Sequence, residues 1–145
     1  MREIKFRAWI EPTKEMVYQE SGIMADHIQL YTYFDSLVRI MNLSVINASN
    51  KRVNCLLQLY TGLKDKNGKE IYEGDIIQSV YEFEGKKQLG VVNFINGCFT
   101  LNFLGDIELD GELLCSACSM EEIIGNLYEN PELLEEKKDA DNKAF

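Results

Sequence analysis

The first hydrophobic pattern in the chain is an alternation over residues 4–9. Successive side chains of an extended strand point to opposite faces, so a two-residue period predicts a strand with one covered face. The expected core face carries Ile4, Phe6 and Ala8, and the expected outer face carries Lys5, Arg7 and Trp9. Pro12 favours a turn over residues 11–14, and residues 16–18 return as a second strand. We therefore expect the chain to open with a β-hairpin.

The stretch from residue 20 to residue 52 supports two interpretations. Its apolar residues recur at helical spacing, yet many are aromatic or β-branched, which also suits strands. We favour a short helix around residues 34–42. The small polar residues 47–52 predict a loop, and apolar alternation over residues 53–59 predicts a further strand.

Two Asn-Gly pairs predict tight reversals, because both residue types tolerate positive φ angles. Asn67-Gly68 is the first pair, and Asn96-Gly97 is the second. Extended stretches surround the second pair on both sides, and another reversal lies near residue 85. Residues 76–103 are therefore expected to form three consecutive antiparallel strands.

The turn at Asn96-Gly97 also predicts a register. A two-residue type I′ turn sets Ile95 opposite Cys98, Phe94 opposite Phe99 and Val92 opposite Leu101. The last four of these residues then lie on one face of the sheet. We expect other elements to cover that whole face, because it is apolar.

The end of the chain carries signals for short elements. Ser119 and Glu122 have the spacing of a capping box, but Gly125 follows too soon for a long helix. We expect one turn there and then a short extended piece. Asn130 at a cap position and Pro131 at the first helical position predict a short terminal helix.

Composition narrows the class of protein. The chain has 145 residues, of which 46% are apolar and 27% are charged, and these values are typical of one folded domain. No apolar run approaches the roughly 18 residues of a membrane helix. The first residues lack the apolar stretch of a secretory signal, so we expect a soluble cytoplasmic protein with reduced cysteines.

Charge is distributed unevenly along the chain. The formal net charge is −9, and residues 104–145 alone hold 3 basic and 12 acidic residues. An acidic surface repels a phosphate backbone, so this third of the chain disfavours nucleic-acid binding. It forms either a solvated surface or a face that docks a basic protein. The candidate docking residues are Asp106, Glu108, Asp110, Glu112, Glu121 and Glu122.

The sequence contains no complete catalytic or metal-binding pattern. His27 is the single histidine, so a nucleophile would have only this base available. Cys115 and Cys118 form half of a four-thiolate zinc site, but Cys55 and Cys98 stand alone rather than as a second pair. No glycine-rich phosphate loop is present. We therefore expect no enzyme activity, no metal and no cofactor.

A nucleic-acid interface is the alternative function. The outer face of the first strand would place two cations beside an aromatic ring, which is how single-stranded nucleic acid is bound. The candidate contacts are Lys5, Arg7, Trp9, Lys51 and Arg52. Against this alternative, a lone tryptophan usually packs into a core.

Four segments of the chain together resemble a known family. They are KFRAW at residues 5–9, YTGLKDKNGKEIYEGDI at residues 60–76, GVV at residues 90–92 and IGNLYENPEL at residues 124–133. In this combination the chain resembles the YopX family, small proteins carried by bacteriophages and prophages. The resemblance implies a mainly β fold with an SH3-like barrel in the host-cell cytoplasm. It implies no activity, cofactor or catalytic residue, and it does not extend to residues 19–57 or 104–120.

These observations combine into one expected organisation. Residues 1–58 form an N-terminal hairpin and a variable helix or loop segment, residues 59–138 form the SH3-like barrel of antiparallel strands with a short C-terminal helix, and residues 139–145 fray. The expected function is that of a non-enzymatic phage or prophage binding protein. Its partner is an unidentified host or phage protein or a second copy of the chain, and no membrane is involved. Asp75, after Gly74, is expected to be structural, with its carboxylate accepting backbone N–H groups.

Overall fold

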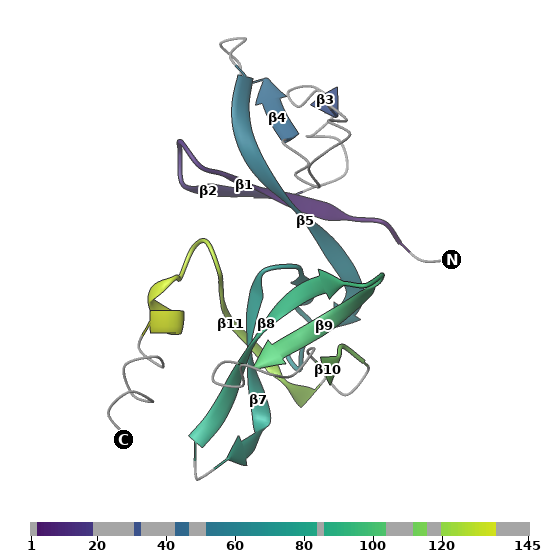
Figure 1. The fold of residues 1–145 in the computed structure, drawn as a ribbon. Coiled ribbons are helices and arrows are strands. Elements are labelled where there is room, and N and C mark those ends of the chain that lie inside the picture. Colours follow the sequence, from purple (N-terminus) through teal and green to yellow (C-terminus); the bar gives the residue numbers. More distant parts are fainter. Residues whose placement is uncertain are drawn as a thin grey trace. The chain divides into compact units, whose positions relative to one another are not determined.

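The computed structural model of the chain describes residues 3–18, 31–32, 43–46, 52–83, 86–103, 112–115 and 120–135. Within these residues the fold is mainly β, with eleven strands and one helical turn at residues 132–135 (Figure 1). The mainly β class expected from the sequence is confirmed. No helix in the described part is long and apolar enough to cross a membrane.

The chain divides into two compact units. Residues Ile4–Leu59 form the N-terminal unit, and Tyr60–Phe145 together with Met1–Glu3 form the C-terminal unit. Strand β5 (Arg52–Lys64) runs from one unit into the other.

The N-terminal unit contains one antiparallel sheet in the order β2-β1-β5-β4-β3. Its further strands are β1 (Phe6–Ile10), β2 (Glu15–Tyr18), β3 (Tyr31–Thr32) and β4 (Leu43–Ile46). The predicted hairpin of β1 and β2 is confirmed. Its turn closes with a 2.9 Å hydrogen bond from the Lys14 N–H to the Ile10 carbonyl. The helix expected at residues 34–42 lies outside the described residues.

Strand β1 is covered on both faces, which corrects the expected outer face. Arg7 is 1% exposed and Trp9 is 4% exposed. Strand β1 lies between β2 and β5, so Arg7 and Trp9 each have a cross-strand neighbour on either side. Arg7 lies opposite Tyr18 and Gln58, and these neighbours enclose it.

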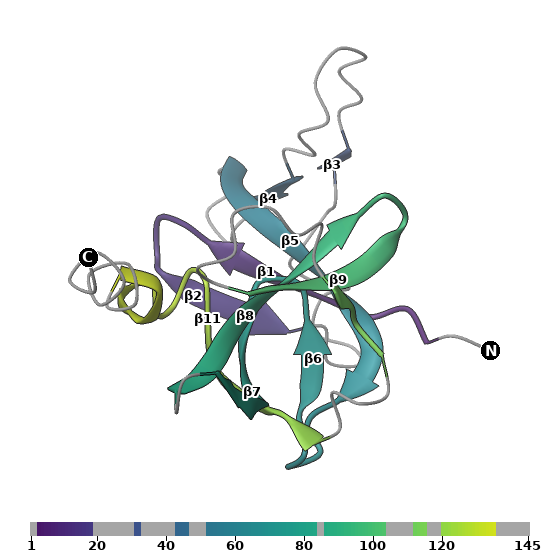
Figure 2. The ribbon, with the colours of Figure 1, turned by 60° about the horizontal axis from the view of Figure 1, so that its bottom comes forward.

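The C-terminal unit contains a second antiparallel sheet in the order β10-β9-β8-β7-β11. Its strands are β7 (Asp75–Phe83), β8 (Lys86–Ile95), β9 (Cys98–Phe103), β10 (Glu112–Leu113) and β11 (Glu122–Asn126). Strand β6 (Glu70–Tyr72) pairs with the end of β5. The sheet curls strongly, as half of a barrel does (Figure 2).

Both faces of this sheet are packed. One face forms a buried cluster of Ile71, Ile77, Val92, Leu101 and Ile123. The other face forms a second buried cluster of Ile76, Leu89 and Val91, against which Leu133 and Leu134 pack from the region of the helical turn. Apolar residues therefore alternate between two covered surfaces along β7 and β8.

The turn between β8 and β9 has the predicted form. Asn96 has a φ of 52° and Gly97 a φ of 84°, as a type I′ turn requires. The register is also the predicted one, with Phe94 opposite Phe99. The three strands expected over residues 76–103 are confirmed.

Candidate functional site

Asp65 lies at the centre of the first Asn-Gly loop. One of its carboxylate oxygens accepts the N–H groups of Asn67 and Lys69, both at 2.9 Å. The other oxygen accepts the N–H of Ile123 in β11 at 3.2 Å. Burial by itself raises the pKa of Asp65, but the three N–H groups and the Lys69 charge together hold it below its ordinary value. The carboxylate therefore joins the loop to a strand 58 residues away.

The carboxylate of Asp75 likewise accepts hydrogen bonds that hold the loop that enters β7. Its carboxylate accepts the Tyr72 N–H at 2.8 Å and the side-chain amide of Asn126 at 3.3 Å. The side-chain oxygen of Asn126 in turn accepts the N–H of Tyr128 at 3.0 Å. The predicted structural role of Asp75 in accepting backbone N–H groups is confirmed.

Asn130 caps the preceding turn rather than the helix that follows it. Its side-chain oxygen accepts the Asn126 N–H at 3.3 Å, and its backbone carbonyl accepts the Leu133 N–H at 3.2 Å. Gly125 permits this arrangement, because a Cβ atom there would lie 2.7 Å from a Leu133 methyl carbon and 2.9 Å from the Asn130 side-chain oxygen.

The two longest motif segments thus bind to each other. The Asn126 side-chain amide donates to the Asp75 carboxylate, and the Leu127 N–H donates to the Gly74 carbonyl at 2.8 Å. These polar groups use their oxygens to hold neighbouring loops, so their chemistry in this arrangement is that of a scaffold.

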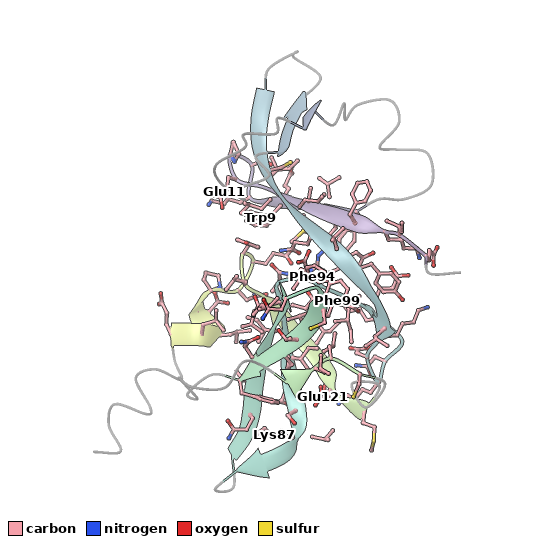
Figure 3. The ribbon with its side chains drawn as sticks, turned by 45° about the vertical axis from the view of Figure 1, so that its right-hand side comes forward. Trp9, Glu11, Lys87, Phe94, Phe99 and Glu121 are labelled. Atoms are coloured by element: carbon pink, nitrogen blue, oxygen red, sulfur yellow. The ribbon has the colours of Figure 1, made fainter. Side chains whose placement is uncertain are left out.

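The end of the β8–β9 hairpin presents a different surface. Phe94 and Phe99 pack edge to face with ring centroids 4.9 Å apart, yet Phe94 is 46% exposed and its neighbour Ile95 is 38% exposed (Figure 3). We call Phe94, Ile95 and Phe99 the hairpin end. The predicted pairing of Phe94 with Phe99 is confirmed, but the prediction that other elements cover this whole face is wrong at Phe94.

The position of the pair explains its exposure. Val92 and Leu101, which share its face, are 0% and 4% exposed because they lie within the packed part of the sheet. Phe94 lies two residues before Asn96, and β7 pairs with β8 only as far as Val91, so this neighbouring strand ends before it reaches Phe94. The feature of the sequence that indicates this exposure is the position of both phenylalanines close to the two-residue turn.

The candidate nucleic-acid residues do not form the expected exposed set. The Arg7 guanidinium donates to the Gln58 side-chain oxygen at 2.6 Å and lies 5.8 Å from the centre of the Tyr18 ring. The Trp9 indole donates to Glu11 at 3.0 Å, and Glu11 also pairs with Lys14 at 2.7 Å (Figure 3). The hydrogen bonds from Lys14 and Trp9 lower the pKa of Glu11.

Three candidate nucleic-acid contacts remain, and the structure describes two of them. Lys5 is partly buried, and Arg52 begins β5. Lys51 lies outside the described residues.

The structure also corrects the candidate acidic docking face, because one of its six residues is buried and another is ion-paired. Glu121 is 8% exposed, and its Oε2 atom has no hydrogen-bond partner among the described residues. Glu122 is paired with Lys66 at 2.5 Å, and the hydrogen bond from Lys66 lowers the pKa of Glu122. Glu112 lies in β10. The other three candidates, Asp106, Glu108 and Asp110, lie outside the described residues.

Glu121 is therefore not part of an exposed surface. Its backbone carbonyl accepts the Lys66 N–H at 2.9 Å, so the strand pairing that anchors the first Asn-Gly loop draws this residue inward. Nothing in the local sequence, which reads Ser-Met-Glu-Glu, distinguishes the buried glutamate from its exposed neighbour.

The candidate catalytic and metal-binding residues are described only in part. His27 and Cys118 lie outside the described residues. Within the described residues, no three His, Cys, Asp or Glu side chains lie close enough together to hold a metal ion. Burial raises the pKa of the Cys55 thiol to about 11.

Comparison with known proteins identifies relatives along nearly the whole chain. The sequence profile of a family described as "YopX protein" matches residues 5–135. The crystal structure of protein EF1440 from Enterococcus faecalis is 25% identical and has a TM-score of 0.59, covering 92% of this chain and 99% of that one. The crystal structure of protein yopX from Bacillus subtilis covers the same shares with 19% identity and a TM-score of 0.54, which shows the fold alone. No curated protein matches the chain.

Proposed function

Because this chain belongs to the YopX family, whose description names no reaction or ligand, we propose its role from its surface. We propose that it is a non-enzymatic accessory protein of phage or prophage origin that acts by binding another protein through the hairpin end. The observation that carries the proposal is the exposure of Phe94 beside Phe99.

An aromatic pair at this position suits a protein contact. Aromatic side chains bury a large area and lose little conformational entropy on binding, so they are enriched among residues that dominate interface energies. The two rings already hold each other in an edge-to-face arrangement, which reduces that cost further. A partner that covers Phe94 gains apolar burial without first reshaping the hairpin.

The charge of the hairpin indicates what kind of partner fits. Residues 88–105 contain no lysine, arginine, histidine, aspartate or glutamate. A phosphate backbone is bound chiefly by cations, so this end of the hairpin is unsuited to nucleic acid. It suits an apolar patch on a protein. Glu121 and Glu122 do not carry the proposal, because Glu121 is buried and Glu122 is ion-paired.

The test compares the wild type with Phe94→Ser and with a matched control, Val80→Ser. Val80 is 43% exposed on β7, so the control removes a similarly exposed apolar side chain from the same unit. Sedimentation first shows whether a second copy of the chain is the partner. Proteins captured from an infected or lysogenic host by the wild type are then purified, and their dissociation constants are measured directly.

We expect Phe94→Ser to weaken the complex by about tenfold or more, the size of a dominant interface residue, while Val80→Ser changes it less than about threefold. We also expect binding to persist at raised salt, because an apolar contact is not screened. Equal binding by both variants, or binding abolished by salt, would contradict the proposal. So would turnover on a hydrolase panel that His27→Ala removes.

A further inference from the structure

Two free thiols lie on neighbouring strands of the C-terminal unit. Cys98 is the first residue of β9, and Cys115 lies two residues after the end of β10. Seventeen positions separate them in sequence, so their proximity depends on the strand pairing.

The pairing of β9 with β10, when it is continued past the last residue of β10, brings the two cysteines opposite each other. Strand β10 pairs antiparallel with β9. The pairing continues one residue past β10, because the Leu114 N–H donates to the Phe99 carbonyl at 3.0 Å. The next position of the same register sets Cys115 opposite Cys98.

The geometry of such a pair suits a disulfide bond. Phe99 and Leu114 are a hydrogen-bonded pair, so the adjoining pair of cysteines is of the non-hydrogen-bonded kind. The α-carbons of a non-hydrogen-bonded pair lie about 4.5 Å apart, and their side chains leave the same face of the sheet. A disulfide spans α-carbon distances of about 4.4–6.8 Å, which includes this value.

The two thiols are also accessible. Cys115 is exposed, and Cys98 is partly buried with its Sγ atom 3.2 Å from the Ile95 carbonyl oxygen. Cys55 offers an internal comparison, because it is 3% exposed and therefore out of reach of a reagent in solution.

We propose that Cys98 and Cys115 form a reversible cross-strand disulfide when the protein meets a low-molecular-weight disulfide. The thiolate of Cys115 attacks one sulfur of that reagent, whose S–S bond breaks and releases one small thiolate. The thiolate of Cys98 then attacks the Cys115 sulfur, forms the protein disulfide and releases the second small thiolate. The reagent gains two electrons, and the two protons lost by the cysteines go to the released thiolates.

The bond has a structural consequence. Strand β10 has two residues and forms the edge of its sheet, and β9 is the strand with which it pairs among the described residues. A covalent link at Cys115 closes the chain between β9 and β10 and fixes that edge. The oxidised protein is therefore the more stable form.

The experiment treats the intact reduced protein with oxidised glutathione, blocks the remaining thiols with an alkylating agent and maps the disulfides by mass spectrometry without reduction. We expect a peptide pair joined through Cys98 and Cys115. Cys98→Ser and Cys115→Ser should abolish the link, while Cys118→Ser and Cys55→Ser should retain it. Dithiothreitol should reverse it, and the thermal midpoint of the oxidised form should be higher by about 5 °C or more.

Three results would overturn the proposal. One is a link between Cys115 and Cys118, which lie three positions apart in sequence. Another is a link between two chains, seen as a dimer on non-reducing gels. The last is a stable glutathione adduct at Cys115 with Cys98 left free. Each result is read from the wild type, so it does not depend on a variant that folds.

Discussion

At the scale of single residues, buried carboxylates in this chain act as acceptors for the backbone. Asp65 receives three N–H groups, and Asp75 receives one N–H group and the Asn126 side-chain amide. Each aspartate is at most 5% exposed. Removing either carboxylate leaves one buried N–H group, that of Ile123 at Asp65 or that of Tyr72 at Asp75, without its acceptor, and that loss is costly.

Asp75→Ala tests this role directly. The Tyr72 N–H would lose its acceptor at 2.8 Å, so we expect the free energy of unfolding to fall by about 2 to 3 kcal/mol, as measured by urea denaturation. Glu129→Ala removes an exposed carboxylate and should change the stability by no more than about 0.5 kcal/mol. An unchanged midpoint in Asp75→Ala would show that the hydrogen bonds of this carboxylate contribute nothing.

At the scale of elements, the fold depends on how closely strands β8 and β9 approach. The Asn96-Gly97 turn sets their register, and Gly90 sets their packing. A Cβ atom on Gly90 would lie 2.6 Å from the Leu101 Cγ atom, which is inside any real contact distance. Leu101 therefore fills the space that a larger residue at position 90 would need.

Gly90→Ala should be destabilising, although alanine is ordinarily the better residue in a strand. Overpacking in a filled core costs about 1 to 3 kcal/mol, which exceeds the usual gain of about 0.5 to 1 kcal/mol from replacing glycine. The measurement is a double-mutant cycle with Leu101→Ala. In the Leu101→Ala background the added methyl group has room, so Gly90→Ala should then be neutral or stabilising. An equal cost in both backgrounds would rule out the clash with Leu101.

At the scale of the whole molecule, the two units bury separate apolar clusters. Ala8 and Cys55 lie in the cluster of the N-terminal unit, and the C-terminal unit has its own two clusters. The net charge of −9 spreads repulsion over the chain at neutral pH. Stability in acid then reflects two opposed effects, the relief of that repulsion and the protonation of carboxylates that the fold holds ionised.

The second effect can be isolated at Asp65, whose pKa in the folded protein lies below its ordinary value of 3.8. A lowered pKa adds stability above that ordinary value, and this stability is lost as the pH falls through the folded pKa. We expect Asp65→Asn to be less stable than the wild type at pH 7, by about 1 to 2 kcal/mol, and the difference to shrink below about pH 4.

Urea denaturation at a series of pH values measures this difference. Glu129→Gln makes the same change of charge at the exposed surface and serves as the control. A constant gap between the wild type and Asp65→Asn from pH 7 to pH 3 would contradict the role assigned to the ionised carboxylate.

The candidate surface was only partly predictable. Phe94 and Phe99 were predicted to pair, because the Asn96-Gly97 turn specifies their register locally. The exposure of Phe94 was not predicted, because it depends on where the neighbouring strands end. The burial of Arg7 and Trp9 depends in the same way on β5, which joins β1 from about fifty residues away.

The turns, the strands beside them and the family can be predicted from the residues alone, because φ preferences, side-chain alternation and motif residues act over a few positions. Which side chains reach solvent and which distant residues meet depends on the folded arrangement of the strands. Glu121 is buried while Glu122 is ion-paired, because β11 pairs with β7, a strand remote in sequence. Such pairings depend on the packing of the whole unit, and no local pattern encodes them.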